Sequence, residues 1–200
     1  MSHTFWDQRY SSAELVYGES PNDFLASMAD KLPNAGEALD IGAGEGRNAL
    51  FLASHGLSVL AVDQSTVGMQ KAQRLATARG LKLRTQVADL TDFDAKPDSF
   101  AVVTSIFCHL PAPLRAAVHA RACLWLKPGG VFLLEAYAPE QITRDTGGPK
   151  DPLLLASLEQ ILGELSGLTI AHKAAMVRRV VEGQFHGGDA SVVQVVARKL

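Results

Sequence analysis

The sequence predicts an α/β fold built on a doubly wound, mostly parallel sheet. Short apolar runs typical of buried strands alternate along the chain with longer amphipathic patterns typical of helices. Several of these runs are apolar nearly throughout, as parallel strands covered on both faces tend to be. Three glycines within residues 42–46 separate one such run from the helical pattern that follows it, which is the arrangement of a strand, a tight turn and a helix.

The first 20 residues have a different pattern. Phe5, Trp6, Tyr10 and Tyr17 lie among polar residues in an irregular pattern. We therefore expect this stretch to fold over another part of the molecule instead of forming a core element.

The next part of the chain predicts two strands among three helices. Pro21 and Asp23 suit the first turn of a helix, Gly56 suits a helix end, and Ser65 can cap the helix that follows it. The expected elements are a helix at 20–32, a strand at 38–41, a helix at 46–55, a strand at 57–62 and a helix at 65–79.

The pattern continues with three strands and two helices. Residues 127–130 form a Lys-Pro-Gly-Gly turn before the last of these strands, and residues 139–152 are a polar loop after it. The expected elements are strands at 81–87 and 99–107, a helix at 113–126, a strand at 131–137 and a helix at 153–163.

The C-terminal part lacks a helix between its strands. Residues 168–181 and 191–199 are strand-like, and residues 182–189 join them. Two strands joined directly pair antiparallel, so we expect a hairpin that closes one edge of the sheet.

The composition of the chain argues against several classes of function. The chain has 200 residues, of which 47% are hydrophobic and 20% charged, and its formal net charge is −2. The chain has no basic block, so we do not expect a nucleic-acid partner. No apolar run approaches the roughly 20 residues of a membrane-spanning helix. Neither the histidines nor Cys108 and Cys123 show the spacing of a metal site. Two cysteines and no leader pattern suggest a cytoplasmic protein.

The glycine turn at residues 42–46 is the clearest indication of a ligand-binding site. Gly42, Gly44 and Gly46 let the backbone approach a ligand, and the third glycine of the dinucleotide pattern would fall at Arg47. Asp40, inside the preceding strand, suits a cofactor with a free amino group better than one with a pyrophosphate. An ordinary strand-to-helix turn is the alternative.

Two further acids follow predicted strands. Asp63 lies where α/β nucleotide folds bind ribose hydroxyls, and Asp89 is placed to accept the adenine amino group. Met69 and Leu90 can flank the adenine ring, or they can be core residues.

These motifs resemble those of class I methyltransferases that depend on S-adenosylmethionine. Residues 40–48, 62–63 and 127–130 carry the resemblance. Residues 5–10, together with Gly-Arg-Asn at 46–48 and the Leu-Ala that follows, resemble the tellurite-resistance and thiopurine branch. The resemblance implies a seven-stranded sheet with an antiparallel last strand, formed by residues 1–200 as one domain with residues 1–20 as a lid.

The resemblance also implies which residues bind S-adenosylmethionine. They come from the lid, from the glycine turn and from the ends of the following strands. They are Trp6, Arg9, Tyr10, Tyr17, Asp40, Gly42, Ala43, Gly44, Arg47, Asn48, Asp63, Gln64, Met69, Ala88, Asp89, Leu90, Ser105, Ile106 and Phe107.

The sequence says less about the methyl acceptor. His109 and His186 are candidates for a general base, and Arg144 and Lys150 for binding an anionic substrate. Alternatively, His109 makes a structural hydrogen bond and His186 is a solvated turn residue. The alternative for Arg144 and Lys150 is a mobile surface loop. Cys108 is a candidate for binding a thiophilic atom, and burial is the alternative.

We expect an enzyme that methylates a small molecule, such as a thiol, a metalloid oxyanion or a similar soft nucleophile. A monomer or weak homodimer without nucleic-acid or membrane partners fits this expectation. A regulatory protein that binds the cofactor without turnover and a nicotinamide-dependent oxidoreductase are the alternatives.

Overall fold

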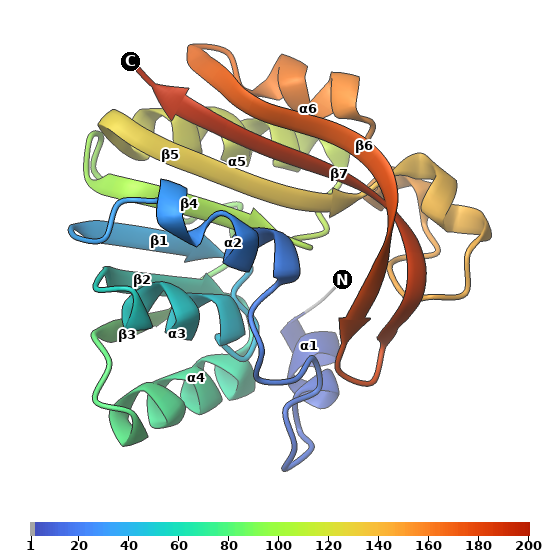
Figure 1. Cartoon of the computed structure of the whole chain (residues 1–200). Coiled ribbons are helices and arrows are strands. Elements are labelled where there is room, and N and C mark those ends of the chain that lie inside the picture. The colour runs from blue at the N-terminus through green and yellow to red at the C-terminus, as the bar shows by residue number, and fades with distance from the viewer. Residues whose placement is uncertain (1–2) are drawn as a thin grey trace.

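Seven strands form one sheet in the order β3-β2-β1-β4-β5-β7-β6 in the computed structural model, which describes residues 3–200 (Figure 1). The strands β1 to β5 run parallel, and β7 runs antiparallel to both of its neighbours. The strands are β1 (Glu37–Ile41), β2 (Ser58–Asp63), β3 (Leu83–Val87), β4 (Phe100–Ile106), β5 (Leu126–Tyr137), β6 (Leu168–Glu182) and β7 (His186–Lys199). The prediction of seven strands with an antiparallel last strand is therefore confirmed.

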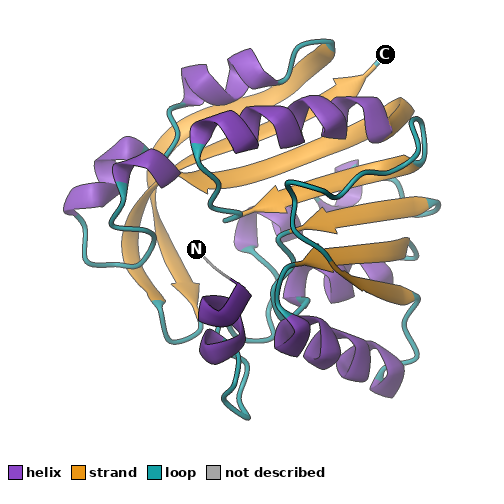
Figure 2. Cartoon of the chain, turned by 180° about the vertical axis from the view of Figure 1, so that it is seen from behind, coloured by secondary structure: helices purple, strands orange, loops and turns teal. Residues whose placement is uncertain are grey.

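The helices divide between the two faces of the sheet. One apolar core lies under α2 (Asp23–Ser27), α3 (Arg47–Ser54) and α4 (Thr66–Ala78). The other lies under α5 (Ala112–Trp125) and α6 (Leu158–Glu164), which cover the face seen in Figure 2. None of the described helices is long and apolar enough to cross a membrane.

Strand β1 shows how the sequence supplies both cores. Its side chains alternate across the sheet, so Ala38 packs on one face while Leu39 and Ile41 pack on the other. The order of the strands reverses at β1, because β2 lies on one side of it and β4 on the other. A crevice for a ligand is expected at such a switch point, beyond the carboxyl ends of the strands.

Two predicted helices differ in extent from the observed ones. The helix expected at 20–32 ends at Ser27 and continues as a separate 3-10 turn, Ala29–Lys31. The Ser27 hydroxyl donates to the Phe24 carbonyl, a bond that competes with the helical pattern. The helix expected at 153–163 begins only at Leu158, because Ser157 and Gln160 form a capping box there.

The C-terminal hairpin is longer than predicted. The strands β6 and β7 have 15 and 14 residues, and only residues 183–185 connect them, instead of residues 182–189. The far half of this hairpin extends past the sheet toward the N-terminal helix α1 (His3–Arg9), as Figure 1 shows. At its tip the Gln184 amide donates to the Val16 carbonyl at 3.0 Å.

The N-terminal segment, residues 3–18, is held against α4 and the glycine turn before α3. The Asp7 carboxylate accepts hydrogen bonds from the Ser65 hydroxyl and the Val67 amide at the start of α4. The ammonium of Lys71 donates to the carbonyls of Ser12 and Glu14. The described part of this segment therefore packs on α4, and its first residues form α1, which the sequence pattern did not predict. Its role as a lid over the cofactor stays a prediction.

Candidate cofactor and acceptor site

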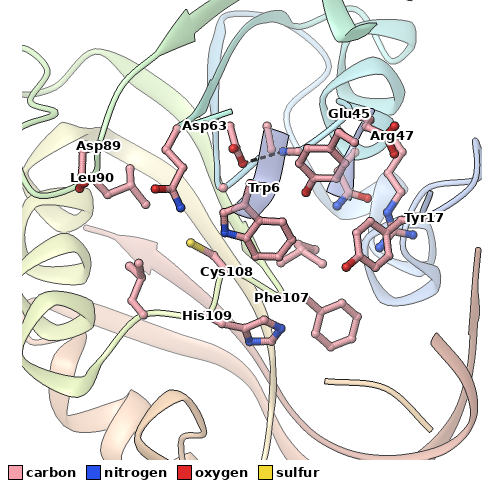
Figure 3. Close-up of a pocket in the computed structure, with 18 of the residues that line it drawn as sticks. Trp6, Tyr17, Glu45, Arg47, Asp63, Asp89, Leu90, Phe107, Cys108 and His109 are labelled. Carbon is pink, nitrogen blue, oxygen red and sulfur yellow. Dashed lines mark hydrogen bonds between the residues drawn. The ribbon is translucent and has the colours of Figure 1, made fainter. Parts of the chain in front are cut away.

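A cavity of about 290 Å³ lies beyond the carboxyl ends of β1, β2 and β4. Its walls come from the glycine turn after β1, the loops after β2, β3 and β4, the N-terminal segment and the start of β7. Figure 3 shows Asp63 at the end of β2, and Cys108 and His109 after β4, facing the same space as Trp6 and Tyr17 of the N-terminal segment. The cavity therefore joins residues from both ends of the chain.

The glycine turn has the left-handed backbone that its residues allow. Gly42, Gly44 and Gly46 have φ angles of 68°, 57° and 86°. A Cβ at Gly44 would lie 2.7 Å from the Tyr10 hydroxyl, and one at Gly42 would lie 2.7 Å from the Cys108 sulfur. The glycines thus also let two cavity walls pack against the turn.

Asp63 links β2 to the glycine turn. Its Oδ2 accepts a hydrogen bond from the Gly44 amide at 2.9 Å, and its Oδ1 accepts one from the Ser65 amide at 2.8 Å (Figure 3 shows the first). Burial raises the pKa of Asp63, and these backbone donors oppose the rise. A carboxylate oxygen can accept more than one hydrogen bond, so Asp63 retains acceptor capacity on the cavity side.

Asp40 lies in β1 behind the glycine turn. Its Oδ1 accepts a hydrogen bond from the Thr104 hydroxyl at 2.7 Å, while its Oδ2 is buried and has no partner among the described residues. Burial raises the pKa of Asp40 to about 7, although the Thr104 hydrogen bond opposes this. A buried carboxylate oxygen without a donor is a costly arrangement that a cationic ligand group would relieve.

Aromatic rings form the wall toward the N-terminal segment. The rings of Trp6 and Tyr10 stack with centroids 5.6 Å apart, and Tyr17 meets Tyr10 edge-on at 6.3 Å. Burial and the nearby Asp63 raise the pKa of Tyr10 well above its usual range, so its phenol stays protonated.

A second group of rings lies across the cavity. Phe107 and Tyr137 stack with centroids 4.5 Å apart, and His109 stacks on Tyr137 at 5.6 Å. The ring of His186 meets Phe107 edge-on at 5.2 Å. Phe107 has a positive φ of 50°, a strained backbone for a residue with a side chain, and its amide donates to the Glu135 carbonyl. With this backbone conformation, Phe107 lines the cavity.

The two histidines differ in their surroundings. Burial and the neighbouring His186 lower the pKa of His109 to about 3, so its imidazole is neutral and binds a proton weakly. His186 is buried, and its Nδ1 lies 3.5 Å from Oε2 of Glu182. His186 is therefore the better placed of the two to receive a proton.

Comparison with known proteins identifies this architecture. Residues 38–130 match the family model described as a methyltransferase domain. Residues 38–130 are therefore a methyltransferase domain, and the sheet has the class I methyltransferase fold. The cofactor of such a domain is S-adenosylmethionine, as the sequence predicted.

Two curated relatives are methyltransferases. The methyltransferase domain is similar to 2-heptyl-1-hydroxyquinolin-4(1H)-one methyltransferase of Mycobacteroides abscessus, with 27% identity over 64% of this chain and 58% of the relative. It is also similar to phosphoethanolamine N-methyltransferase 1 of Triticum aestivum, with 30% identity over 69% of this chain and 28% of the relative. The chain therefore spans less than two thirds of either relative's length.

Solved structures share the fold. TehB from Haemophilus influenzae superposes with a TM-score of 0.74 and 15% identity, over 99% of this chain and 67% of that one. A methyltransferase from Methanosarcina mazei superposes with a TM-score of 0.72 and 19% identity, over 87% and 97%. A protein from work on converting a disulfide into a thioacetal in echinomycin biosynthesis gives a TM-score of 0.79 at 20% identity, over 98% and 92%.

The observed site fits S-adenosylmethionine. Asp63 has acceptor capacity for hydroxyls. The unpartnered oxygen of Asp40 lies behind the cavity lining, where it suits an amino group held through an intervening water. The aromatic walls suit a sulfonium, because ring faces attract cations.

Most of the predicted cofactor residues of the methyltransferase domain line this cavity, and so do both predicted bases. They are Trp6, Tyr10, Tyr17, Gly42, Ala43, Gly44, Arg47, Asn48, Asp63, Gln64, Ala88, Asp89, Leu90, Ile106, Phe107, His109 and His186.

Four other predicted cofactor residues lie outside the cavity lining. Met69 is a core residue of α4, and Ser105 is buried in β4. Asp40 lies behind the turn, and Arg9 lies with its guanidinium 4.1 Å from the centroid of the Phe185 ring. These four do not line the cavity, and their part in binding the cofactor stays a prediction.

The predicted anion-binding residues lie away from the cavity. Arg144 donates to the Asp189 carbonyl at 3.2 Å, and Lys150 pairs with Asp145 at 3.0 Å. Arg144 therefore bonds to the backbone of β7, and Lys150 pairs within the polar loop after β5. His186 was expected in a connecting loop, but it is a buried residue at the start of β7.

Several cavity residues were missed as site residues from the sequence. They are Gly18, Glu45, Thr91, Leu110, Pro111 and Leu114, and Cys108 was considered only as a site for a thiophilic atom. Glu45 belongs to the glycine motif itself, so that motif signalled it. Burial raises the pKa of the Cys108 thiol, so it is no thiolate at neutral pH. In the described residues no group of histidine, cysteine or acidic side chains is placed to hold a metal ion.

Proposed function

We propose that this protein transfers the methyl group of S-adenosylmethionine to a small planar aromatic molecule. The observation that carries the proposal is the continuity of one cavity, from the glycine turn and Asp63 to the ring-lined wall that contains Phe107 and His186. The cofactor supplies an electrophilic methyl carbon on a sulfonium. The protein's main task is then to align the acceptor atom with that carbon.

The ring-lined wall favours an aromatic acceptor over an oxyanion. Phe107, His109 and His186 line the cavity with rings that suit a flat apolar molecule, and Tyr137 packs behind them. Arg47 is the one cationic side chain lining the described cavity, and it already pairs with Glu182 and donates to the Ser20 carbonyl. The quinolone named for the M. abscessus relative is also a flat ring system. A thiol or a similar soft nucleophile on such a ring is compatible with the same wall.

One half of the cavity binds the cofactor, and the other half binds the methyl acceptor. Asp63 accepts hydroxyl hydrogen bonds, and Trp6, Tyr10 and Tyr17 cover the opening. Phe107 fixes the plane of the acceptor by stacking. His186 faces the cavity and receives a proton where the acceptor carries one.

The same proposal covers the lid, the cellular compartment and the oligomeric state of the protein. We take residues 1–200 as one methyltransferase domain, in which residues 1–20 serve as the lid; residues 1 and 2 lie outside the described part of the structure. Both cysteines are free, which suits a reducing cytoplasm. A monomer or weak homodimer without nucleic-acid partners is the form that we expect to be active.

Calorimetry and a turnover assay test the function. The protein should bind S-adenosylmethionine and S-adenosylhomocysteine but not NADH, and binding of NADH alone would contradict the proposal. Production of S-adenosylhomocysteine should then be measured with aromatic hydroxyls, aromatic thiols, selenite and tellurite. Turnover of the aromatic compounds supports the proposal. Cofactor binding without any product would instead indicate a regulatory protein.

A further inference from the structure

We propose that Glu182 is a positioning residue, which orients His186 so that its Nε2 takes the proton of a hydroxyl or N–H methyl acceptor. This inference rests on the proposed function and narrows its substrate class. Glu182 lies outside the cavity lining, so it acts through His186.

The backbone of the β6–β7 hairpin places Glu182 beside His186. Glu182 and His186 are directly opposite residues of the antiparallel β6–β7 ladder, and side chains in such a pair project to the same face. The connecting residue Gly183 has a φ of 64°, and a Cβ there would lie 2.2 Å from the Val16 carbonyl oxygen. The tight tip therefore holds the pair against the N-terminal segment.

Glu182 is itself firmly held. Its Oε1 accepts from Asn22 Nδ2 at 2.9 Å, its Oε2 pairs with the Arg47 guanidinium, and Arg178 lies 3.5 Å from Oε1. Burial raises the pKa of Glu182, but the hydrogen bond with His186 and the charge of Arg47 outweigh it and bring the pKa to about 2. Glu182 is thus a buried, fixed carboxylate at neutral pH.

The carboxylate decides which ring nitrogen of His186 carries the proton. Among the described residues, the His186 ring has one hydrogen-bond partner, with its Nδ1 at 3.5 Å from Glu182 Oε2. A carboxylate accepts only, so neutral His186 carries its hydrogen on Nδ1 and leaves the Nε2 lone pair free. The His186 ring lies with its centroid 4.8 Å from that of Tyr17, and it meets Phe107 and Tyr137 in T-shaped contacts.

Other titratable groups surround this pair. Tyr17 and Tyr137 are phenols whose pKa is raised by burial, and His109 is neutral because burial lowers its pKa. Arg47 and Arg178 lie on the far side of Glu182. Glu182 is therefore the one anion in direct contact with His186 among the described residues.

The chemical consequence concerns the acceptor. As the acceptor atom bonds to the methyl carbon, its own hydrogen passes to Nε2 of His186, and the electrons of the broken carbon–sulfur bond stay on sulfur. The resulting imidazolium is stabilised by the Glu182 carboxylate and later returns its proton to water. A thiolate has no proton to lose, so it gains nothing from this pair.

The test compares two acceptors of the same shape, 2-naphthol and 2-naphthalenethiol. Glu182→Gln should lower kcat for the naphthol at least about 30-fold and change kcat for the thiol less than about threefold, because general-base catalysis contributes about 10²–10⁴-fold. The acid limb of the naphthol pH profile should move to lower pH, since the imidazolium loses its carboxylate. Glu182→Asp should restore part of the naphthol rate. Glu140→Gln, in the exposed loop after β5, is the matched control.

A second measurement does not depend on turnover. The ¹⁵N shifts of the His186 ring should show the Nδ1–H tautomer in the wild-type protein, and a changed tautomer balance in Glu182→Gln. An unchanged balance, or equal losses with both acceptors, would overturn the proposal. No turnover of any acceptor by the wild-type protein would instead sink the proposed function. If Glu182→Gln does not fold, His186→Gln must show the same acceptor-selective loss.

Discussion

The Arg178 guanidinium on β6 reaches across β7 to the Glu135 carboxylate on β5, with 2.6 Å between Nη2 and Oε2. Glu135 is fully buried, and it also accepts hydrogen bonds from Asn22 and Gln194. Together with Glu182 and Arg47, these groups form one polar network that joins α2, α3 and the hairpin. The network fixes the hairpin relative to the cofactor turn.

Arg178→Ala should destabilise the fold by about 3–5 kcal/mol, because it leaves the buried Glu135 charge without its cation. The free energy of unfolding from urea titrations measures this. Arg179→Ala changes the exposed neighbour on the same strand and should cost less than about 0.5 kcal/mol. Equal effects of the two substitutions would show that the network contributes no net stability.

Asp63→Ala should weaken binding of S-adenosylhomocysteine by about 1.5–3 kcal/mol, which is about 10- to 150-fold in Kd. The variant loses the acceptor of the Gly44 and Ser65 amides together with the predicted contacts to the ribose. Calorimetry gives the affinity, and Asp92→Ala, an exposed acid on the loop after β3, is the control. Unchanged affinity of Asp63→Ala would mean that other groups bind the ribose.

Lys71→Met should loosen the N-terminal segment. The Lys71 ammonium pairs with buried Glu45 at 2.7 Å and binds the Ser12 and Glu14 carbonyls, while Glu45 accepts from the Val16 amide. We expect amide hydrogen exchange in residues 10–18 to rise at least about tenfold, since local opening needs fewer bonds to break. Lys82→Met, at an exposed position, should leave exchange unchanged. Slow exchange in both variants would show that the aromatic contacts alone hold the segment.

Asp40→Asn should flatten the pH dependence of stability in the cofactor-free protein. Burial raises the pKa of Asp40 from 3.8 to about 7 in the folded state, so the folded protein holds a proton that the unfolded chain has released. Stability is therefore lost as pH rises from about 4 to 7. Between pH 4 and pH 8 the variant should gain up to about 4 kcal/mol relative to wild type, measured by denaturant titration. A constant difference at both pH values would contradict a raised pKa.

The local parts of the fold could be predicted from the sequence. Strand β1, the glycine turn and α3 follow from residues within about a dozen positions, and both Gly44 and Asp63 were placed at the site because each follows a strand. Gly187 and Gly188 misled the prediction of the hairpin, because glycines indicate a loop, yet both lie in the β6–β7 ladder.

The buried network could not be predicted. Glu135 and Glu182 are charged residues in strands, and local pattern assigns such residues to a surface, whereas Asn22 bonds to them across 113 and 160 positions. Met69 shows the same limit, because helical periodicity gives an inward face without distinguishing the core from a cavity wall.

The contact between Gln184 and Val16 also has a consequence for biosynthesis. The aromatic wall from the N-terminal segment is made early, but the hairpin tip that fixes it follows about 170 residues later. A ribosome-bound chain ending before β6 would expose Trp6, Tyr10 and Tyr17 without the tip that covers them. Cofactor capture should therefore begin only after β7 has left the ribosome.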